Sequence, residues 1–312
     1  MESSENFMAG GALTRRSFLG GAFAAGAAAL APHSVFSAGT DAKRGRILLG
    51  ACLTGRDAVE TMKSIGFDFC EGGVADAVNP FRNGEWWKKR RDELRSLALP
   101  VRSLAGFIPG KFRLTGPKAD HAPALDYAVK ALERASEIGV KYVVLGSGAA
   151  RNVPGKNPSK EELEKGVLQF TDFCRALAKR MEGVRGVTVV VEPLRARESN
   201  IVNTVAEGKK IVDAAGSPRI RLLADIFHMM EGNDGPGGIA AAGRAIKHCH
   251  VAECGTRSFP GDNPAAAARL EPYFAALKSI GYGGGVSCEC GWRRKNIAKQ
   301  LETAFKTLKG MI

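Results

Sequence analysis

Three carboxylates and one imidazole stand at the ends of apolar segments in the second half of the chain. They are Glu192, Asp225, His250 and Glu289. If they converged on one point, the carboxylates would repel one another unless a cation neutralised them. An oxygen-rich ligand set with one nitrogen favours Mn²⁺, Mg²⁺ or Co²⁺, and it also admits Zn²⁺. The pattern therefore predicts one divalent metal ion per chain, with Mn²⁺ as the preferred ion.

Such convergence requires parallel strands, and the sequence alternates eight short apolar runs with helix-forming stretches. In a barrel of eight parallel strands, the carboxyl ends of the strands meet on one face, the mouth, where active sites lie. A doubly wound open sheet is the alternative, but no G-x-G-x-x-G pattern follows the first run. We therefore predict an α/β fold, a single (β/α)8 TIM barrel, with strands over residues 47–52, 67–71, 101–107, 141–146, 187–192, 220–225, 246–252 and 285–290.

Each of the four residues also has an ordinary structural explanation. Glu192 could pair with Arg195 or Arg197, and Asp225 could cap the N-terminus of a helix. His248 and His250 share one face of their strand, and a lone histidine there is more often a core residue than a ligand. The occurrence of all four at successive strand ends is what favours a metal site.

The start of the chain predicts export. The twin-arginine stretch TRRSFL begins at residue 14, an Ala/Gly-rich run follows, and small residues at 37 and 38 offer a cleavage site. We predict a cleavable signal peptide over residues 1–38 and the barrel domain over 39–312, with the twin-arginine translocation machinery as partner and a periplasmic or otherwise exported location. A disordered tail is the alternative. No later apolar run is long enough to span a bilayer, so stable membrane insertion is not expected.

The formal net charge of +13 is compatible with anionic partners. The basic residues are dispersed along the chain, however, so solvated helix faces are the preferred explanation. The seven cysteines do not form the pattern of a disulfide framework. Cys288 and Cys290 face away from Glu289 and are expected to pack as small core residues, although one bridge after export stays open.

Four segments together resemble the metal-dependent ketose 3-epimerases of the xylose isomerase-like barrel superfamily. In chain order they are EPLRARE from residue 192 with a later Asn-Thr pair, DIFHM from residue 225, HVAE from residue 250 with a following Pro-Gly pair, and Glu289. In the second half of the chain, the resemblance rests on these motifs. In the first half, it rests only on the alternation of apolar runs with helix-forming stretches. The order and separations of the four segments are more specific than any single one. The stretch RAR before Glu198 departs from the family's Asn-aromatic pattern.

This resemblance implies roles for particular residues. The four residues of the opening pattern would be the metal ligands, and Glu192 and Glu289 would double as the acid/base pair. Glu198, His228 and Arg257 would hold the substrate around its O1 and O2 atoms. A homo-oligomer, either a dimer or a tetramer, is also implied.

Other side chains are expected at the mouth from their positions alone. Glu71 ends the second strand, and it would contact a sugar hydroxyl or, equally consistently, form a structural ion pair. Trp292 could form an apolar wall against a sugar ring. Lys111, Arg113 and Arg151 fall in loops after the third and fourth strands, where solvation is a better explanation than recognition of a phosphate or carboxylate.

These residue types suit proton abstraction next to a carbonyl, because a divalent cation can stabilise the enediolate that forms. We predict an exported, metal-dependent sugar isomerase or epimerase that acts on a small carbohydrate. A 3-keto-glycoside lyase or deglycosidase would start from the same enediolate and stays open. A non-catalytic sugar-binding barrel fits less well with two intact glutamates. An apurinic endonuclease-like function, and with it a nucleic-acid partner, is disfavoured because its metal cluster needs more ligands than the chain's five histidines supply.

Overall fold

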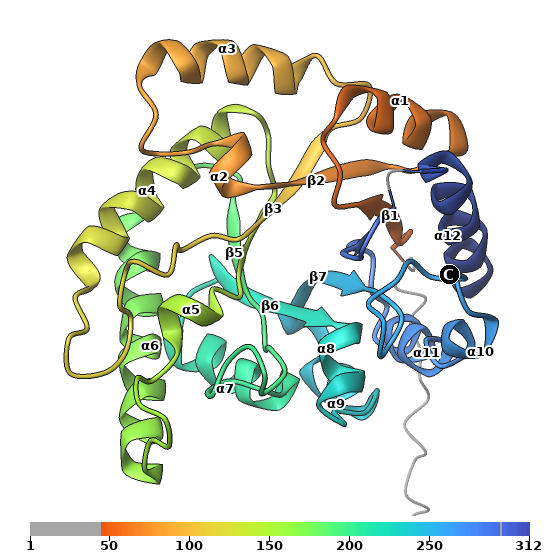
Figure 1. The fold of residues 1–312 in the computed structure, drawn as a ribbon. Coiled ribbons are helices and arrows are strands. Elements are labelled where there is room, and N and C mark those ends of the chain that lie inside the picture. The colour runs from red at the N-terminus through yellow and green to blue at the C-terminus, as the bar shows by residue number, and fades with distance from the viewer. Residues whose placement is uncertain (1–44, 294) are drawn as a thin grey trace, which may run out of the picture. The chain divides into compact units, whose positions relative to one another are not determined.

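The strands close into a complete ring. The computed structural model describes residues 45–293 and 295–312, so the predicted signal peptide over 1–38 lies outside the described residues. Eight parallel strands pair in chain order, and β8 pairs with β1 to close the barrel (Figure 1). This confirms the predicted (β/α)8 barrel. The strands are β1 Leu48–Ala51, β2 Phe69–Gly73, β3 Val101–Ala105, β4 Tyr142–Leu145, β5 Thr188–Val191, β6 Ile220–Asp225, β7 Ile246–Val251 and β8 Gly285–Cys288.

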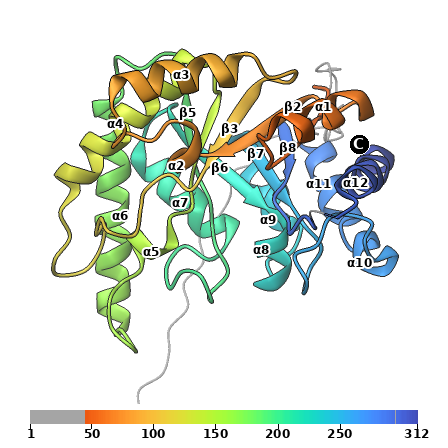
Figure 2. The same cartoon turned by 45° about the horizontal axis from the view of Figure 1, so that its top comes forward.

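Helices surround this ring on the outside, as Figures 1 and 2 show. Those of the first half are α1 Arg56–Ile65, α2 Val74–Ala77, α3 Gly84–Arg95, α4 His121–Glu137, α5 Gly148–Arg151 and α6 Lys160–Arg180. Those of the second half are α7 Val205–Ala215, α8 Ile226–Glu231, α9 Gly237–Ala242, the 3-10 turn η1 Gly243–Ala245, α10 Pro264–Ala268, α11 Glu271–Ser279 and α12 Ile297–Met311. None of the described helices combines the length and the apolar character needed to cross a membrane.

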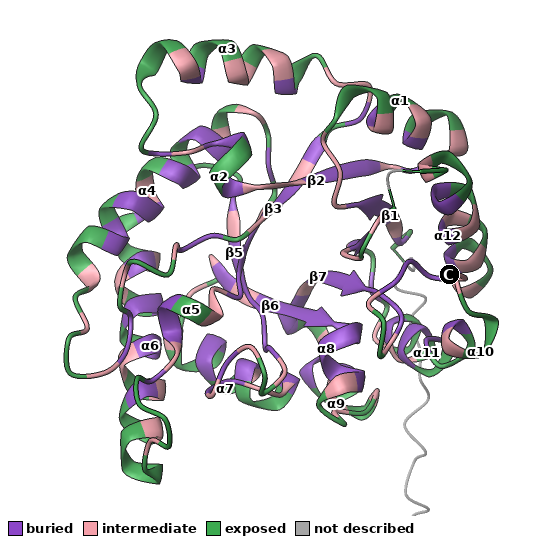
Figure 3. Ribbon diagram, in the orientation of Figure 1, coloured by how far each residue is buried: buried purple, intermediate pink, exposed green. Residues whose placement is uncertain are grey.

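The strands are buried on both faces, which explains their nearly continuous apolar sequences (Figure 3). Within the ring, Val144, Val190 and Leu223 form a small cluster of their own. The opposite faces of the strands join the larger core beneath the helices, and Cys288 belongs to that core, as its spacing from Glu289 predicts. All seven cysteines are free thiols.

Local signals fix the helix that follows β5 and thereby the loop at the mouth. Thr204 and Glu207 form a capping box at the start of α7, in which the Glu207 amide donates to the Thr204 hydroxyl at 3.1 Å. Asp225, the last residue of β6, caps α8 through its Oδ1 atom, which accepts from the Phe227 and His228 amides at 2.8 and 3.2 Å. The helix starts therefore set where the polar side chains of these two loops lie.

Candidate metal centre

The four side chains at the strand ends converge. Glu192 follows β5, Asp225 ends β6, His250 lies on β7, and Glu289 follows β8. Each offers one oxygen or nitrogen atom, and these four atoms lie within 4.8 Å of one another. The His250 Nδ1 atom is 3.2 Å from Glu192 Oε1 and 3.4 Å from Glu289 Oε2. This group, which we call the metal centre, is of a size that a single cation could span.

The metal centre also contains a buried carboxylate oxygen without a hydrogen-bond partner, as expected of a group that binds a cation. Oδ2 of Asp225 is buried and has no hydrogen-bond partner among the described residues, whereas Oδ1 is occupied by the helix cap. An unpartnered buried carboxylate oxygen is costly unless something positive lies against it. The two expectations for Asp225, helix cap and ligand, are thus compatible, because each uses a different oxygen.

Electrostatics at the metal centre indicate the same need for positive charge. Burial, and after it the charge of Glu289, raise the pKa of Asp225 to about 6. Burial likewise raises the pKa of Glu192, and the hydrogen bond from His250 offsets this only in part. Burial alone would raise the pKa of Glu289 too, but the charges of His250 and Arg257 lower it. The two glutamates that flank His250 therefore differ in proton affinity.

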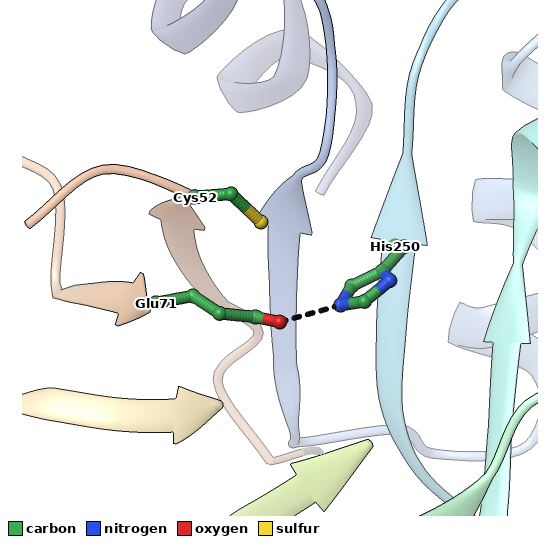
Figure 4. A group of neighbouring side chains, drawn as sticks. All are labelled: Cys52, Glu71 and His250. Carbon is green, nitrogen blue, oxygen red and sulfur yellow. Dashed lines mark hydrogen bonds and ion pairs between the residues drawn. The ribbon is translucent and has the colours of Figure 1, made fainter. Parts of the chain in front are cut away.

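Beneath the metal centre, Glu71 holds the far side of His250 (Figure 4). Its Oε1 atom is 2.8 Å from His250 Nε2, and its Oε2 atom is 2.8 Å from His248 Nε2 and accepts from the Ser103 hydroxyl at 2.6 Å. Without a metal, the surrounding carboxylates outweigh burial and raise the pKa of His250, so that Nδ1 also carries a proton toward Glu192. A bound cation would replace that Nδ1 proton, while the Nε2 proton would stay hydrogen-bonded to Glu71. The carboxylate thus selects the ring atom that a metal would use.

This position differs from the mouth-facing position expected for Glu71. The side chain is 1% exposed, and both of its oxygens are engaged by the chain's own groups. The geometry agrees with the structural ion pair, which was the other expectation. Attraction to His250 and His248 outweighs burial and lowers the pKa of Glu71 well below its usual range. Cys52 completes a second close group with Glu71 and His250.

The three residues expected to hold substrate lie beside the metal centre. Nη2 of Arg257 is 2.5 Å from Glu289 Oε2, and its Nη1 is 3.5 Å from Glu198 Oε1. Nε2 of His228 is 3.6 Å from Asp225 Oδ2 and 3.9 Å from Glu198 Oε2. Arg257 adopts a left-handed backbone conformation with a φ of 51°. A non-glycine residue in this region is uncommon and is often associated with function.

The neighbouring arginine does not neutralise Glu192, which was the ordinary explanation for that glutamate. Arg195 instead pairs with Glu198 at 2.8 Å and with Glu231 at 3.2 Å. Its guanidinium lies 4.8 Å from the centre of the Phe227 ring. Glu192 is therefore left with His250 as its side-chain partner among the described residues.

Trp292 lies three residues beyond Glu289 and stacks on Phe259, with ring centres 5.9 Å apart and an angle of 4° between the planes. Its indole nitrogen is buried without a hydrogen-bond partner in the described part of the chain. The two rings form a flat aromatic pair in the loops after β7 and β8. No contact that the structure records joins Trp292 to the metal centre itself.

Arg151 corrects the expectation of a solvated loop residue. It ends α5, is fully buried, and donates to the Glu192 carbonyl at 2.9 Å, to the Ser199 hydroxyl at 3.1 Å and to the Val202 carbonyl at 3.2 Å. These bonds tie the loop after β5 to the loop after β4, close to a proposed ligand. An isolated arginine carries no sequence signal for such a role, which is why sequence reasoning missed it.

Glycine at the end of β4 makes room for one of the carboxylates. A Cβ atom on Gly146 would lie 2.2 Å from Glu192 Oε2. Gly148 approaches the next loop in the same way, since its Cβ would lie 2.3 Å from the Glu198 carbonyl oxygen. Side chains at these two positions would displace Glu192 and the loop that carries Glu198.

Comparisons with known proteins agree with this fold. The family model described as "Xylose isomerase-like TIM barrel" matches residues 59–311. "Probable ketose 3-epimerase" of Synechocystis sp. is 37% identical over 102 residues, which are 32% of this chain and 33% of that protein, so the chain spans about a third of this curated relative. Ketose 3-epimerases are thus distant homologues.

Two solved structures share the fold at low identity. D-psicose 3-epimerase from Clostridium cellulolyticum H10 has a TM-score of 0.72 and 18% identity, covering 85% of this chain and 99% of that one. 3-Keto-D-glucoside 4-epimerase from E. coli has a TM-score of 0.68 and 18% identity, covering 85% and 100%. The match over residues 59–311 shows that the chain belongs to the xylose isomerase-like TIM barrel family.

Proposed function

We propose that this protein is a divalent-metal-dependent carbohydrate epimerase that acts on the carbon next to a ketose carbonyl. The observation that carries the proposal is the convergence of Glu192, Asp225, His250 and Glu289, whose ligand atoms lie within 4.8 Å of one another. The distant relatives, which include a probable ketose 3-epimerase, support the substrate class. Three oxygens and one nitrogen suit Mn²⁺, with Mg²⁺, Co²⁺ and Zn²⁺ as alternatives.

The chain's own residues would divide the chemistry between them. A bound cation would supply Lewis-acid stabilisation of an enediolate at the carbonyl and adjacent hydroxyl oxygens. Glu289 and Glu192 differ in proton affinity, so one can accept the substrate's proton while the other donates a proton to the opposite face. Removal from one face and return to the other inverts the carbon.

The surrounding groups would orient the substrate and the base. Arg257 holds the Glu289 carboxylate at 2.5 Å and also faces Glu198. The neutral form of His228 is favoured, because burial lowers its pKa. A neutral imidazole and a guanidinium beside the reacting oxygens would stabilise developing negative charge.

Deuterium incorporation tests this proposal whatever the final product. The full chain would be incubated in D₂O with Mn²⁺ and a panel of ketohexoses and ketopentoses, and mass spectrometry would follow deuterium entry. We expect incorporation at the carbon next to the carbonyl together with formation of the epimer. Absence of exchange from every ketose and keto-glycoside, with metal demonstrably bound, would contradict the proposal.

A 3-keto-glycoside lyase or deglycosidase is the second candidate. The likeness to the fold of 3-keto-D-glucoside 4-epimerase supports a glycoside-sized substrate, and the same proton abstraction begins both reactions. Adding 3-keto-glycosides to the panel separates the outcomes. Release of the aglycone would identify a lyase, and an intact epimerised glycoside would identify an epimerase.

We further propose that residues 1–38 direct export through the twin-arginine pathway, on the strength of Arg15 and Arg16 followed by the Ala/Gly-rich run. Expression of the full chain in a bacterium with an active pathway would place the protein in the periplasmic fraction. Replacement of both arginines by lysine should retain it in the cytoplasm, and equal distribution of the two forms would contradict export by this route.

A further inference from the structure

Four cationic side chains gather at the end of the barrel opposite the metal centre. Arg102 is the second residue of β3, Arg221 is the second of β6, and Lys247 is the second of β7, while Arg244 lies in η1 just before β7. The amino ends of parallel strands meet on the face away from the mouth. These four residues, which we call the basal cationic cluster, are therefore separate from the site described above.

Arg221, Arg244 and Lys247 lie close to one another, and none of the four members has an acidic partner among the described residues. Nη2 of Arg221 donates to the Arg244 carbonyl at 2.9 Å. Burial lowers the pKa of Lys247, and the charges of Arg221 and Arg244 lower it further. Within residues 45–293 and 295–312, none of the four takes part in an ion pair. Their mutual repulsion is therefore not compensated by the chain.

Two guanidinium groups of the cluster also have unused donors. The Nε atoms of Arg102 and Arg221 are buried and have no hydrogen-bond partner among the described residues. Arg102 lies 5.8 Å from the centre of the Tyr142 ring, and this ring stacks on His248 at 5.5 Å inside the barrel. The aromatic contact holds Arg102 at the base of the barrel without satisfying its donor.

A cavity of about 280 Å³ opens beside Arg244 and Lys247, whereas Arg102 and Arg221 are not among the residues that line it. Its lining includes Tyr142, Arg244, Lys247, Gly283 and Gly284. The volume is just below the ~300–1,000 Å³ that is usual for drug-sized ligands, so a small ion suits it better than a large molecule. Two of the lining side chains are cationic, and none is acidic.

We propose that this cavity binds a phosphate-type oxyanion. Such an anion would relieve the repulsion within the basal cationic cluster and would accept charge-assisted hydrogen bonds from Arg244 and Lys247. Free phosphate and the phosphate group of a small metabolite share this chemistry. The proposal is independent of the epimerase assignment, because it uses no residue of the mouth.

Titration calorimetry with inorganic phosphate tests the site. The full chain would be kept metal-free with a chelator, so that no cation at the mouth attracts the anion. We expect one phosphate per chain, and the double variant Arg244→Gln/Lys247→Met should bind at least about tenfold more weakly. Lys88→Gln/Lys89→Met removes the same charge from an exposed part of α3 and should bind like the parent.

The sources of the phosphate group are separated by a second arm, in which fructose 6-phosphate and fructose replace inorganic phosphate. Tighter binding of the sugar phosphate than of phosphate would assign a phosphorylated metabolite if Arg244→Gln/Lys247→Met abolishes the difference and fructose alone does not bind. Equal binding would assign the free ion. Absence of heat with both, or equal weakening in the two double variants, would overturn the proposal. Lys247→Met alone provides a milder variant if thermal unfolding shows that the double variant is unstable.

Discussion

Glu71 and His250 are joined at 2.8 Å inside the barrel, and this contact sets which nitrogen of the histidine faces the metal centre. Histidines that bind metals usually donate their other ring N–H to a carboxylate or carbonyl, and loss of that partner weakens binding by about 10–100-fold. In this chain the partner is itself held by His248 and Ser103. The ring orientation is therefore fixed before any metal binds.

Glu71→Gln should weaken Mn²⁺ binding by about 10–100-fold, because the amide holds the His250 ring without a charge. Calorimetric titration of the metal measures this directly and does not depend on turnover. Ser103→Ala removes only one hydrogen bond to Glu71 and should have a much smaller effect. Unchanged metal affinity in the Glu71 variant would show that the carboxylate does not orient the ring.

Glu289→Gln should reduce turnover by about 10²–10⁴-fold, because it removes a general base while keeping an oxygen at the metal centre. Glu198→Gln, farther from the metal centre and paired with Arg195, should mainly raise KM. Steady-state kinetics on the best ketose from the exchange screen distinguish the two effects. Equal loss of kcat in both variants would contradict the separate roles.

The stabilisation given by a metal should depend on pH with a definite sign. Burial raises the pKa of Asp225 to about 6. In the metal-free protein, the protonated Asp225 carboxyl therefore stabilises the folded state at low pH, and this stabilisation is lost as the pH rises through about 6. Metal binding requires the ionised carboxylate. The rise in Tm on adding Mn²⁺ should therefore be larger at pH 7.5 than at pH 5, as scanning fluorimetry would show. An equal rise at both pH values would argue against Asp225 as a ligand.

Arg151→Met should lower the free energy of unfolding by at least about 2 kcal/mol, because it leaves three buried acceptors without their donor. That corresponds to a fall in Tm of ~4–8 °C. Arg197→Met, in the exposed part of the same loop, is the matched control and should change Tm little. Metal affinity should fall only in the Arg151 variant, since Glu192 loses its anchored backbone.

The sequence allowed the barrel and the meeting of its strand ends to be predicted, because both follow from the alternation of elements. All eight expected strands are present, and the differences are at their ends. β3 stops at Ala105 and β8 at Cys288, each two residues earlier than expected, whereas β2 is shifted two residues later and ends at Gly73 instead of at Glu71. Past these points the chain turns away from its neighbours to form the loops of the mouth. Such turns depend on tertiary contacts, which periodicity does not contain.

Long-range contacts explain why other features could not be read from the sequence. Ser103 and His248 form hydrogen bonds with Glu71, from which they are 32 and 177 residues apart in the sequence. No local sequence pattern predicts such contacts. The dual use of Asp225, with one oxygen for a helix and one for a cation, likewise depends on the direction of the carboxylate. Residue type and position indicated where polar groups would gather. They did not indicate which of these groups would form hydrogen bonds within the protein and which would stay free to bind a ligand.

Gly146 has a consequence for how this protein can evolve or be redesigned. The Glu192 carboxylate fills the volume that any substituent at position 146 would need, since even a methyl group would come within 2.2 Å of it. Mutagenesis libraries should therefore leave codon 146 fixed if the position of the Glu192 carboxylate is to be kept, and vary solvent-facing positions of the loops instead. A natural variant with a larger residue there would have to redirect the Glu192 carboxylate, which would remove it from the group of four side chains proposed to bind a cation.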